Sequence, residues 1–149
     1  MRSLSMWKCP KCKRLFANRN QSHSCSSYTL REHLADKSPT AVVLFRAFAR
    51  LVRCCGQMRV VPEKTRIAFQ VRMSFAAVSL RKECMVGHVV LARRLNHPRF
   101  TKIESLSPRN HVHSFCFESV QEIDREVFEW LREAYGVGQQ RHLKKNGER

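Results

Sequence analysis

The sequence predicts an α+β protein, with a small antiparallel, mainly meander sheet of five to six strands. An N-terminal and a C-terminal helix flank this sheet, and a small zinc-binding module precedes it. Cys and His residues cluster near the start, residues 58–118 alternate apolar and polar side chains between turn signals, and helical periodicity bounds that stretch on both sides. We therefore expect a zinc-binding module at 1–37, an α+β domain at 38–138 and a basic tail at 139–149.

The composition favours one compact domain with an anionic partner. The chain has 149 residues, of which 43% are hydrophobic, and its 28 Lys and Arg against 12 Asp and Glu give a formal net charge of +16. No apolar run approaches the roughly 20 residues of a membrane-spanning helix, and the start lacks the apolar core of an export signal. We expect a cytoplasmic protein without membrane contact, whose cysteines stay reduced and bind metal rather than form disulfides.

Cys9, Cys12, His23 and Cys25 follow the pattern C-x2-C-x10-H-x-C. The two-residue gap in the first pair lets one turn aim both sulfurs at one ion, and residues two apart in an extended segment project the same way. Four ligands complete a tetrahedron, so the predicted Zn²⁺ is structural, with no open position for a catalytic water. Neighbouring cations would favour the thiolate form of the ligands: Lys8, Lys11, Lys13, Arg14 and Arg19.

Other interpretations of this cluster stay open. His33 could replace His23 as the fourth ligand. Cys9 and Cys12 could be an unmetallated pair or a redox motif, although nothing before Cys9 predicts the strand that precedes such a motif. The spacing C-x2-C-x3-F resembles the opening of a C2H2 zinc finger, but the paired histidines of its helix are missing, so major-groove readout is not predicted.

The first helix is predicted to begin at Ser38 and Pro39, a suitable N-cap and first helical residue, and to end at Gly56. Apolar residues then recur at helical spacing and arginines occupy another face: Leu44, Phe48, Leu51 and Cys55 on the first, Arg46, Arg50 and Arg53 on the second.

Strands are predicted from period-two patterns at 58–61, 67–71, 75–80, 85–93, 100–106 and 112–117, with turns at 96–98 and 107–110. The connections are too short for crossover helices, which makes the sheet antiparallel. A capping box of Ser119 and Glu122 predicts a last helix over 119–135, with Gly136 after its final turn. Six of the twelve acidic residues fall in 118–133, so this helix should face away from a polyanion.

The stretch from Pro62 to Arg99, with the strings PEKTRIAFQVRMSFA, LARRL and HPRF, continues to SPRNHVH at 107–113. Together these strings resemble a family of bacterial proteins catalogued as domain of unknown function 5655, over roughly residues 40–136. The amino-terminal CPKC with NQSHSC resembles a zinc-binding extension found on some members. The resemblance implies a small α+β domain with the helix first, an antiparallel sheet and a helix last, and it implies no established chemistry.

We expect a non-catalytic, nucleic-acid-associated binding protein, because Lys and Arg contact phosphates without any need for base recognition. The candidate contacts to nucleic acid or another anion combine the cations of the module with those of the sheet and its turns: Lys8, Lys11, Lys13, Arg14, Arg19, Lys64, Arg66, Arg72, Arg109, His111 and His113.

Two other functions compete with this one. Lys64, Arg66, Arg72 and Arg109 could gather with His111 and His113 around a small anion, or the two histidines could bind a metal with His97 or His88 as a third ligand. We favour ordinary hydrogen-bonded histidines at these positions. No nucleophile motif, phosphate loop or carboxylate pair accompanies them, so we assign no reaction. The third function is a regulatory adaptor whose zinc module binds another protein.

Overall fold

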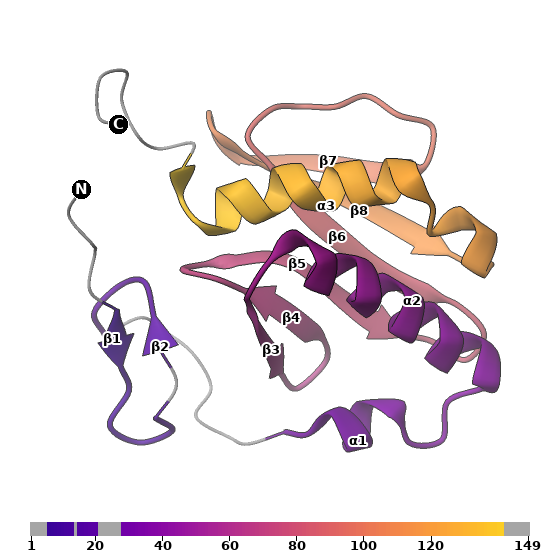
Figure 1. The fold of residues 1–149 in the computed structure, drawn as a ribbon, viewed down its shortest axis with the longest axis horizontal. Helices are drawn as coiled ribbons and strands as arrows, with labels where there is room; N and C mark the ends of the chain where they lie inside the picture. The colour runs from indigo at the N-terminus through magenta and orange to yellow at the C-terminus, as the bar shows by residue number, and fades with distance from the viewer. Residues whose placement is uncertain (1–5, 14, 21–27, 142–149) are drawn as a thin grey trace.

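The computed structural model describes residues 6–13, 15–20 and 28–141 (Figure 1). Its main sheet has six strands in the order β3-β4-β5-β6-β8-β7, and every neighbouring pair is antiparallel. The strands are β3 (Arg59–Pro62), β4 (Ile67–Gln70), β5 (Ser74–Leu80), β6 (Met85–Leu91), β7 (Phe100–Ser107) and β8 (Asn110–Phe117). The predicted α+β class and antiparallel sheet are confirmed.

The sheet departs from a meander at one place. β3 to β6 follow one another along the sheet, but β8 then pairs with β6, and β7 lies outside β8 at the edge. The segment 92–99 therefore passes over the position of β8 before β7 begins, and Figure 1 shows it as a long loop above the sheet. Local periodicity predicts strands but carries no information on this order of neighbours.

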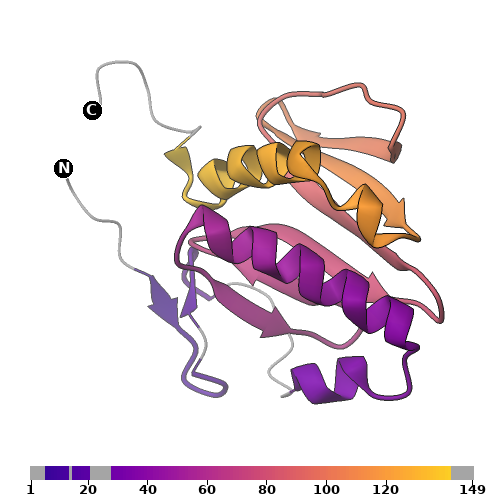
Figure 2. The ribbon, with the colours of Figure 1, turned by 45° about the vertical axis from the view of Figure 1, so that its right-hand side comes forward.

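Two long helices, α2 (Pro39–Cys55) and α3 (Arg125–Gly138), lie next to each other on one face of the sheet (Figures 1 and 2). α2 begins as predicted, because the Ser38 hydroxyl accepts the Ala41 N–H and Pro39 occupies the first turn. Between helix and sheet, Phe48 is fully buried, and its ring centre lies 5.7 Å from that of Phe69 and 5.6 Å from that of Phe115.

The last helix differs from the prediction at both ends. The capping box of Ser119 and Glu122 exists, but it caps a short 3₁₀ turn over Val120–Glu122, and α3 begins six residues later than predicted, with Asp124 as its N-cap. Gly136 does not end the helix. Val137 is buried behind it, and the Gly138 carbonyl accepts the N–H groups of residues 72 and 73, so packing against the sheet carries the helix to Gly138.

Three short elements precede α2 and were not predicted. β1 (Trp7–Lys8) and β2 (Leu15–Phe16) form an antiparallel hairpin. α1 (Leu30–Leu34) begins with a capping box in which Thr29 and Glu32 bond each other's backbone N–H, and both of its leucines pack against the main core. Strands of two residues and a helix of five are too short for periodicity to reveal them.

Candidate nucleic-acid interface and metal site

The β1–β2 hairpin places Cys9 and Cys12 in its turn. The Lys13 N–H donates to the Cys9 carbonyl at 2.8 Å, and Lys13 has a φ of 66°, which turns the chain back into β2. Cys9 is buried and Cys12 half-buried. A strand thus precedes Cys9, contrary to expectation, but another strand follows, so the pair lacks the helix that accompanies a redox motif.

The hairpin has a small apolar centre apart from the main core. Trp7 and Phe16 are cross-strand neighbours with ring centres 5.9 Å apart, and Phe16 and Cys9 are buried at 6% and 3% exposure. None of the three is part of the cluster beneath α2 and α3. So small a centre contributes little folding free energy by itself.

The other half of the predicted ligand set cannot be placed. His23, Cys25 and Arg14 lie outside the described residues, and within 6–13, 15–20 and 28–141 no three His, Cys, Asp or Glu side chains gather as a metal site. His33, the alternative ligand, lies on α1, and its Nε2 is 2.5 Å from the Glu63 carbonyl oxygen. The remaining cysteines form no such site either: Cys55, for instance, donates to the Leu51 carbonyl, and burial raises the pKa of its thiol to about 11.

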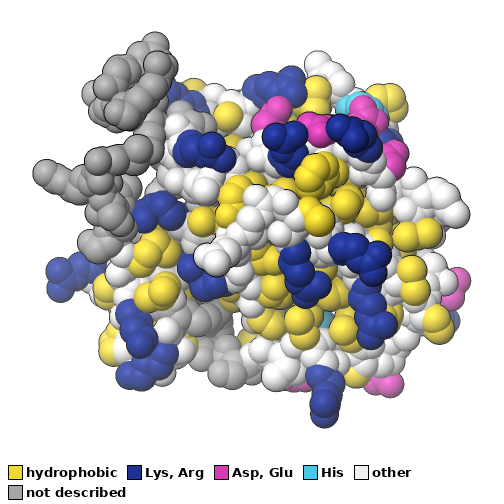
Figure 3. Space-filling view, in the orientation of Figure 1, with side chains coloured by type: hydrophobic (Ala, Val, Ile, Leu, Met, Phe, Trp, Pro, Cys, Tyr) yellow, Lys and Arg dark blue, Asp and Glu magenta, His cyan; other side chains and the backbone are white. Residues whose placement is uncertain are grey.

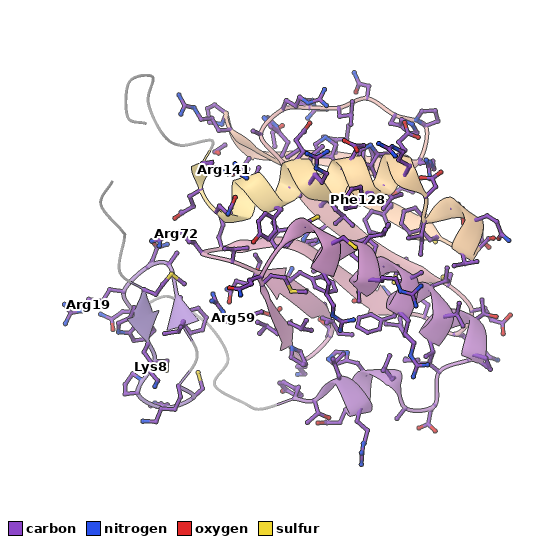
Figure 4. The ribbon with its side chains drawn as sticks, in the orientation of Figure 1. Lys8, Arg19, Arg59, Arg72, Phe128 and Arg141 are labelled. Atoms are coloured by element: carbon purple, nitrogen blue, oxygen red, sulfur yellow. The ribbon has the colours of Figure 1, made fainter. Side chains whose placement is uncertain are left out.

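Cations of the hairpin point to solvent. Lys8, Lys11, Lys13 and Arg19 are exposed. Figure 4 shows Lys8 and Arg19 on the hairpin, with Arg72 and Arg141 along the same side of the view, at the neighbouring end of the body. Arg72 Nε also donates to Gln140 Oε1 at 3.0 Å, which fixes its position at the end of α3.

The predicted cluster of basic side chains on the sheet does not form. Lys64 and Arg66 lie before β4 and Arg72 lies after it, so they belong to opposite ends of that strand. Arg66 pairs with Glu63 at 2.6 Å. Arg109 lies in the turn between β7 and β8, two to three strand positions away from β5, which corresponds to about 10–14 Å.

His111 and His113 share a face of β8, as predicted, but that face is the one covered by the helices. His113 is fully buried; its Nδ1 lies 2.9 Å from the His111 carbonyl, and its Nε2 accepts the Leu95 N–H at 2.9 Å. The His111 ring bonds Ser105 Oγ and the Pro108 carbonyl, at 2.8 and 3.0 Å. All four ring nitrogens have partners within the protein, so neither ring is available to an anion or a metal in this conformation.

The two other histidines considered as third ligands also lie elsewhere. His88 is paired with Ser114, on the sheet face opposite to His113. It lines a groove of about 300 Å³ with Arg66, Ser79 and Cys116. Burial, and then the positive charge of Arg66, lowers the pKa of His88 to about 4, so its ring is neutral at physiological pH. His97 bonds Glu126 Oε2 at 3.0 Å instead.

One basic feature was missing from the predicted contacts. Arg46, Arg50 and Arg53 are exposed on a single face of α2, at spacings of four and three residues, and α2 contains no acidic residue. We call these three residues the α2 arginine row. Figure 3 shows Lys and Arg side chains over α2, whereas acidic side chains gather along the edge of α3. The helical spacing of these arginines is visible in the sequence. The structure adds that no carboxylate of the described residues pairs with them.

The sequence from α1 to α3 matches a known protein family. The model of a domain of unknown function, DUF5655, matches residues 30–138. The chain belongs to the DUF5655 family. No curated protein and no solved structure matches the chain. The matched DUF5655 segment starts at α1 and ends with α3, so it contains the whole main sheet and both long helices, and it leaves the β1–β2 hairpin outside. No helix among the described residues has the length and apolar character to cross a bilayer.

Proposed function

We propose that the protein binds nucleic acid through phosphate contacts, without catalysing a reaction, and that its amino-terminal hairpin forms part of the binding surface. One observation carries this proposal. The first 31 residues contain seven Lys and Arg and no Asp or Glu, and the exposed Lys8, Lys11, Lys13 and Arg19 have no ion pair with any described residue. Cations left without carboxylate partners exchange small counterions for phosphates at little cost.

The proposal includes a structural Zn²⁺ held by Cys9, Cys12, His23 and Cys25. The hairpin turn supports it, because Cys9 and Cys12 come from the same tight turn, in the arrangement that a two-residue spacing gives to paired zinc ligands. Three sulfurs and one imidazole nitrogen are a donor set that Zn²⁺ prefers. When bound, the ion supplies folding free energy that the small centre of Trp7 and Phe16 lacks.

The acidic residues on and around α3 indicate which side of the molecule a polyanion would avoid. In this part of the molecule arginines are paired with acids: Arg93 with Glu133 at 2.9 Å, and Arg99 with Glu126 at 2.6 Å. A polyanion is therefore repelled from α3 and attracted to the hairpin. A small anionic ligand has less support, because among the predicted anion contacts only Arg66 lines the groove on the open face of the sheet, and Glu63 already neutralises it.

The nucleic-acid proposal is tested by electrophoretic mobility of DNA and RNA fragments over a salt series. We expect binding that weakens steeply with salt, and a variant with Lys8, Lys11 and Lys13 changed to Gln that binds more weakly and with a smaller salt slope. A variant with Arg93, Arg125 and Arg132 changed to Gln removes the same charge from the acidic side and serves as the control. Absence of binding by the unaltered protein at low salt contradicts the proposal.

The zinc proposal is tested by metal analysis of the purified protein. We expect close to one zinc per chain, lost in Cys9→Ser and in His23→Ala and retained in Cys84→Ser, the matched cysteine control. His33→Ala decides between the two histidines, since zinc lost in that variant and retained in His23→Ala identifies His33 as the ligand. A metal-free protein that is fully folded contradicts the proposal.

A further inference from the structure

The α2 arginine row forms a straight basic track on the surface. Arg46 and Arg53 are seven residues apart on one helix, which separates their backbone positions by about 10 Å along the axis. None of the three arginines has an ion pair or side-chain hydrogen bond with a described residue. Because the other face of α2 is buried against the core, these side chains extend to solvent only.

The track leads toward the hairpin. Figures 1 and 2 both show the C-terminal end of α2 on the side of the molecule that carries β1 and β2. Arg53 lies in the last turn of α2. Figure 4 shows Arg59 between the body and the hairpin, which carries Lys8 and Arg19 on the same side of the view. The row alone covers about 10 Å, so a ligand that contacts both the row and the hairpin has to be extended, as a nucleic acid is.

The side chains on the exposed face of α2 limit how it recognises a ligand. Apart from the arginines, its exposed positions are Pro39, Thr40, Val43 and Cys54. Asn and Gln, which read adenine in the major groove, are absent, as are Asp and Glu, which read cytosine. Arginine can read guanine, but no side chain that reads the other bases accompanies it here, so the row is better suited to phosphates, which position a protein without specifying sequence.

Aromatic side chains decide between a single strand and a duplex. Proteins that bind single strands stack the bases on exposed aromatic rings. Phe45 and Phe48 of α2 are buried at 4% and 0% exposure, and the large hydrophobic side chains exposed in the described residues are Val43, Leu106 and Val120, with no aromatic among them. No aromatic ring of the described residues is fully exposed, and Trp7 and Phe128 are half-buried, so a base-paired backbone fits this surface better than unstacked bases do.

We infer that the α2 arginine row binds the phosphate backbone of double-stranded nucleic acid, independently of sequence, and extends the surface begun by the hairpin. This inference rests on the proposed function, and it adds the form of the ligand and a second contact surface. Three phosphate contacts contribute about 2.7 to the slope of log affinity against log salt, at about 0.9 for each contact with B-DNA.

The experiment measures fluorescence anisotropy of a labelled short duplex, and of one of its single strands, from about 50 to 200 mM KCl. The row variant has Arg46, Arg50 and Arg53 changed to Gln, and the control has Arg93, Arg125 and Arg132 changed to Gln. Both lose three charges. We expect the duplex slope to fall by about 2 to 3 in the row variant and by less than about 1 in the control, with no preference between GC-rich and AT-rich duplexes.

Two further variants keep the result interpretable. Changing the same three residues to Lys preserves the charge and should preserve the slope, and Arg50→Glu alone should weaken binding more than any single Gln substitution. If the row variant and the control have the same slope, or if the single strand binds more tightly than the duplex, the inference is wrong while the proposed function stands. If the unaltered protein binds neither at low salt, both are wrong.

Discussion

Arg99 Nη2 lies 2.6 Å from Glu126 Oε1, and the guanidinium carbon of Arg99 lies 5.1 Å from the centre of the Trp130 ring. The same guanidinium donates to both carboxylate oxygens of Asp124, the N-cap of α3, and to the Glu122 carbonyl at 2.6 Å. One side chain therefore joins the 92–99 loop to the start of α3. The loop has to be anchored, because it carries the chain past β8 to the edge of the sheet.

Arg99→Lys should destabilise the protein by about 1–2 kcal/mol, because an ammonium group cannot bond two carboxylates, a carbonyl and an aromatic face together. Urea unfolding measures the change. Arg93→Lys is the control on the same loop: Arg93 pairs with Glu133 alone and its side chain is 59% exposed, so a loss below about 0.5 kcal/mol is expected. Equal losses in the two variants would contradict the special role of Arg99.

Two glycines of α3 should respond in opposite directions to alanine. A Cβ on Gly138 would lie 2.6 Å from Phe75 Cδ1, so Gly138→Ala should cost about 1–3 kcal/mol through overpacking. A Cβ on Gly136 meets only the flexible end of Arg141, at 3.8 Å, so Gly136→Ala should stabilise the helix by about 0.5–1 kcal/mol. Thermal unfolding checks both variants. A stabilising Gly138→Ala would show that the Phe75 ring moves aside to accommodate the added Cβ.

His113→Ala should destabilise the protein by about 2–4 kcal/mol, since it leaves a cavity in place of a fully buried ring and the partly buried Leu95 N–H without its acceptor. The zinc content of the purified variant should stay unchanged, because both ring nitrogens of His113 are bonded within the protein. Denaturant titration and metal analysis of the same preparation test the two statements. Loss of zinc in His113→Ala would indicate that a histidine of β8 is a metal ligand.

Stability should fall between neutral pH and pH 5, in part because of His88. Its pKa is about 4 in the folded protein and 6.5 ordinarily, so the unfolded chain binds more protons in that interval and the free energy of unfolding rises with pH. The full contribution is present above pH 6.5 and is lost as the pH falls toward 4, by up to about 3 kcal/mol. Burial also lowers the pKa of His113, which acts in the same direction.

His88→Gln should therefore reduce the difference in stability between pH 7 and pH 5 without abolishing it. Urea titrations at the two pH values measure that difference for the variant and the unaltered protein. An unchanged difference would mean that the pKa of His88 is not lowered in the folded protein.

Removal of zinc should change the hairpin and leave the body folded. The chain has two tryptophans, Trp7 in β1 and the core residue Trp130, so Trp130→Phe leaves Trp7 as the only indole reporter. In this background a chelator should shift the emission of Trp7 while the helical circular dichroism of α2 and α3 persists. The added substitution Cys9→Ser should give the shifted spectrum without chelator. A collapse of the helical signal on chelation would show that the body depends on the metal.

Elements with a long periodic pattern could be predicted from the sequence. α2 agrees from Ser38 to Gly56, and each of the six predicted strands exists within two residues at either end. The prediction that the helix ends before Gly136 is wrong. Glycine is typical of helix ends because it adopts a positive φ without strain, whereas here the burial of Val137 extends the helix by tertiary contacts. The place of β7 outside β8 depends on contacts far apart in the chain, which no local pattern contains.

The candidate site was less predictable. The shared face of His111 and His113 follows from strand alternation, but which face the helices cover does not. The basic side chains of the turns did not gather because turns at the two ends of a strand are separated by its length. The sequence shows the helical spacing of Arg46, Arg50 and Arg53. It does not show which carboxylates lie near them in the fold, because those neighbours come from distant parts of the chain.

The position of β8 between β6 and β7 has a consequence for synthesis of the chain on the ribosome. Until residues 110–117 emerge, β7 has no neighbour with which to pair, because its only partner in the sheet is the strand that follows it. The pairing of β8 with β6 and of β7 with β8 is then a late and non-local event of the kind that slows folding. Nascent chains halted before Asn110 would thus expose the edge of β6 to other unfinished polypeptides.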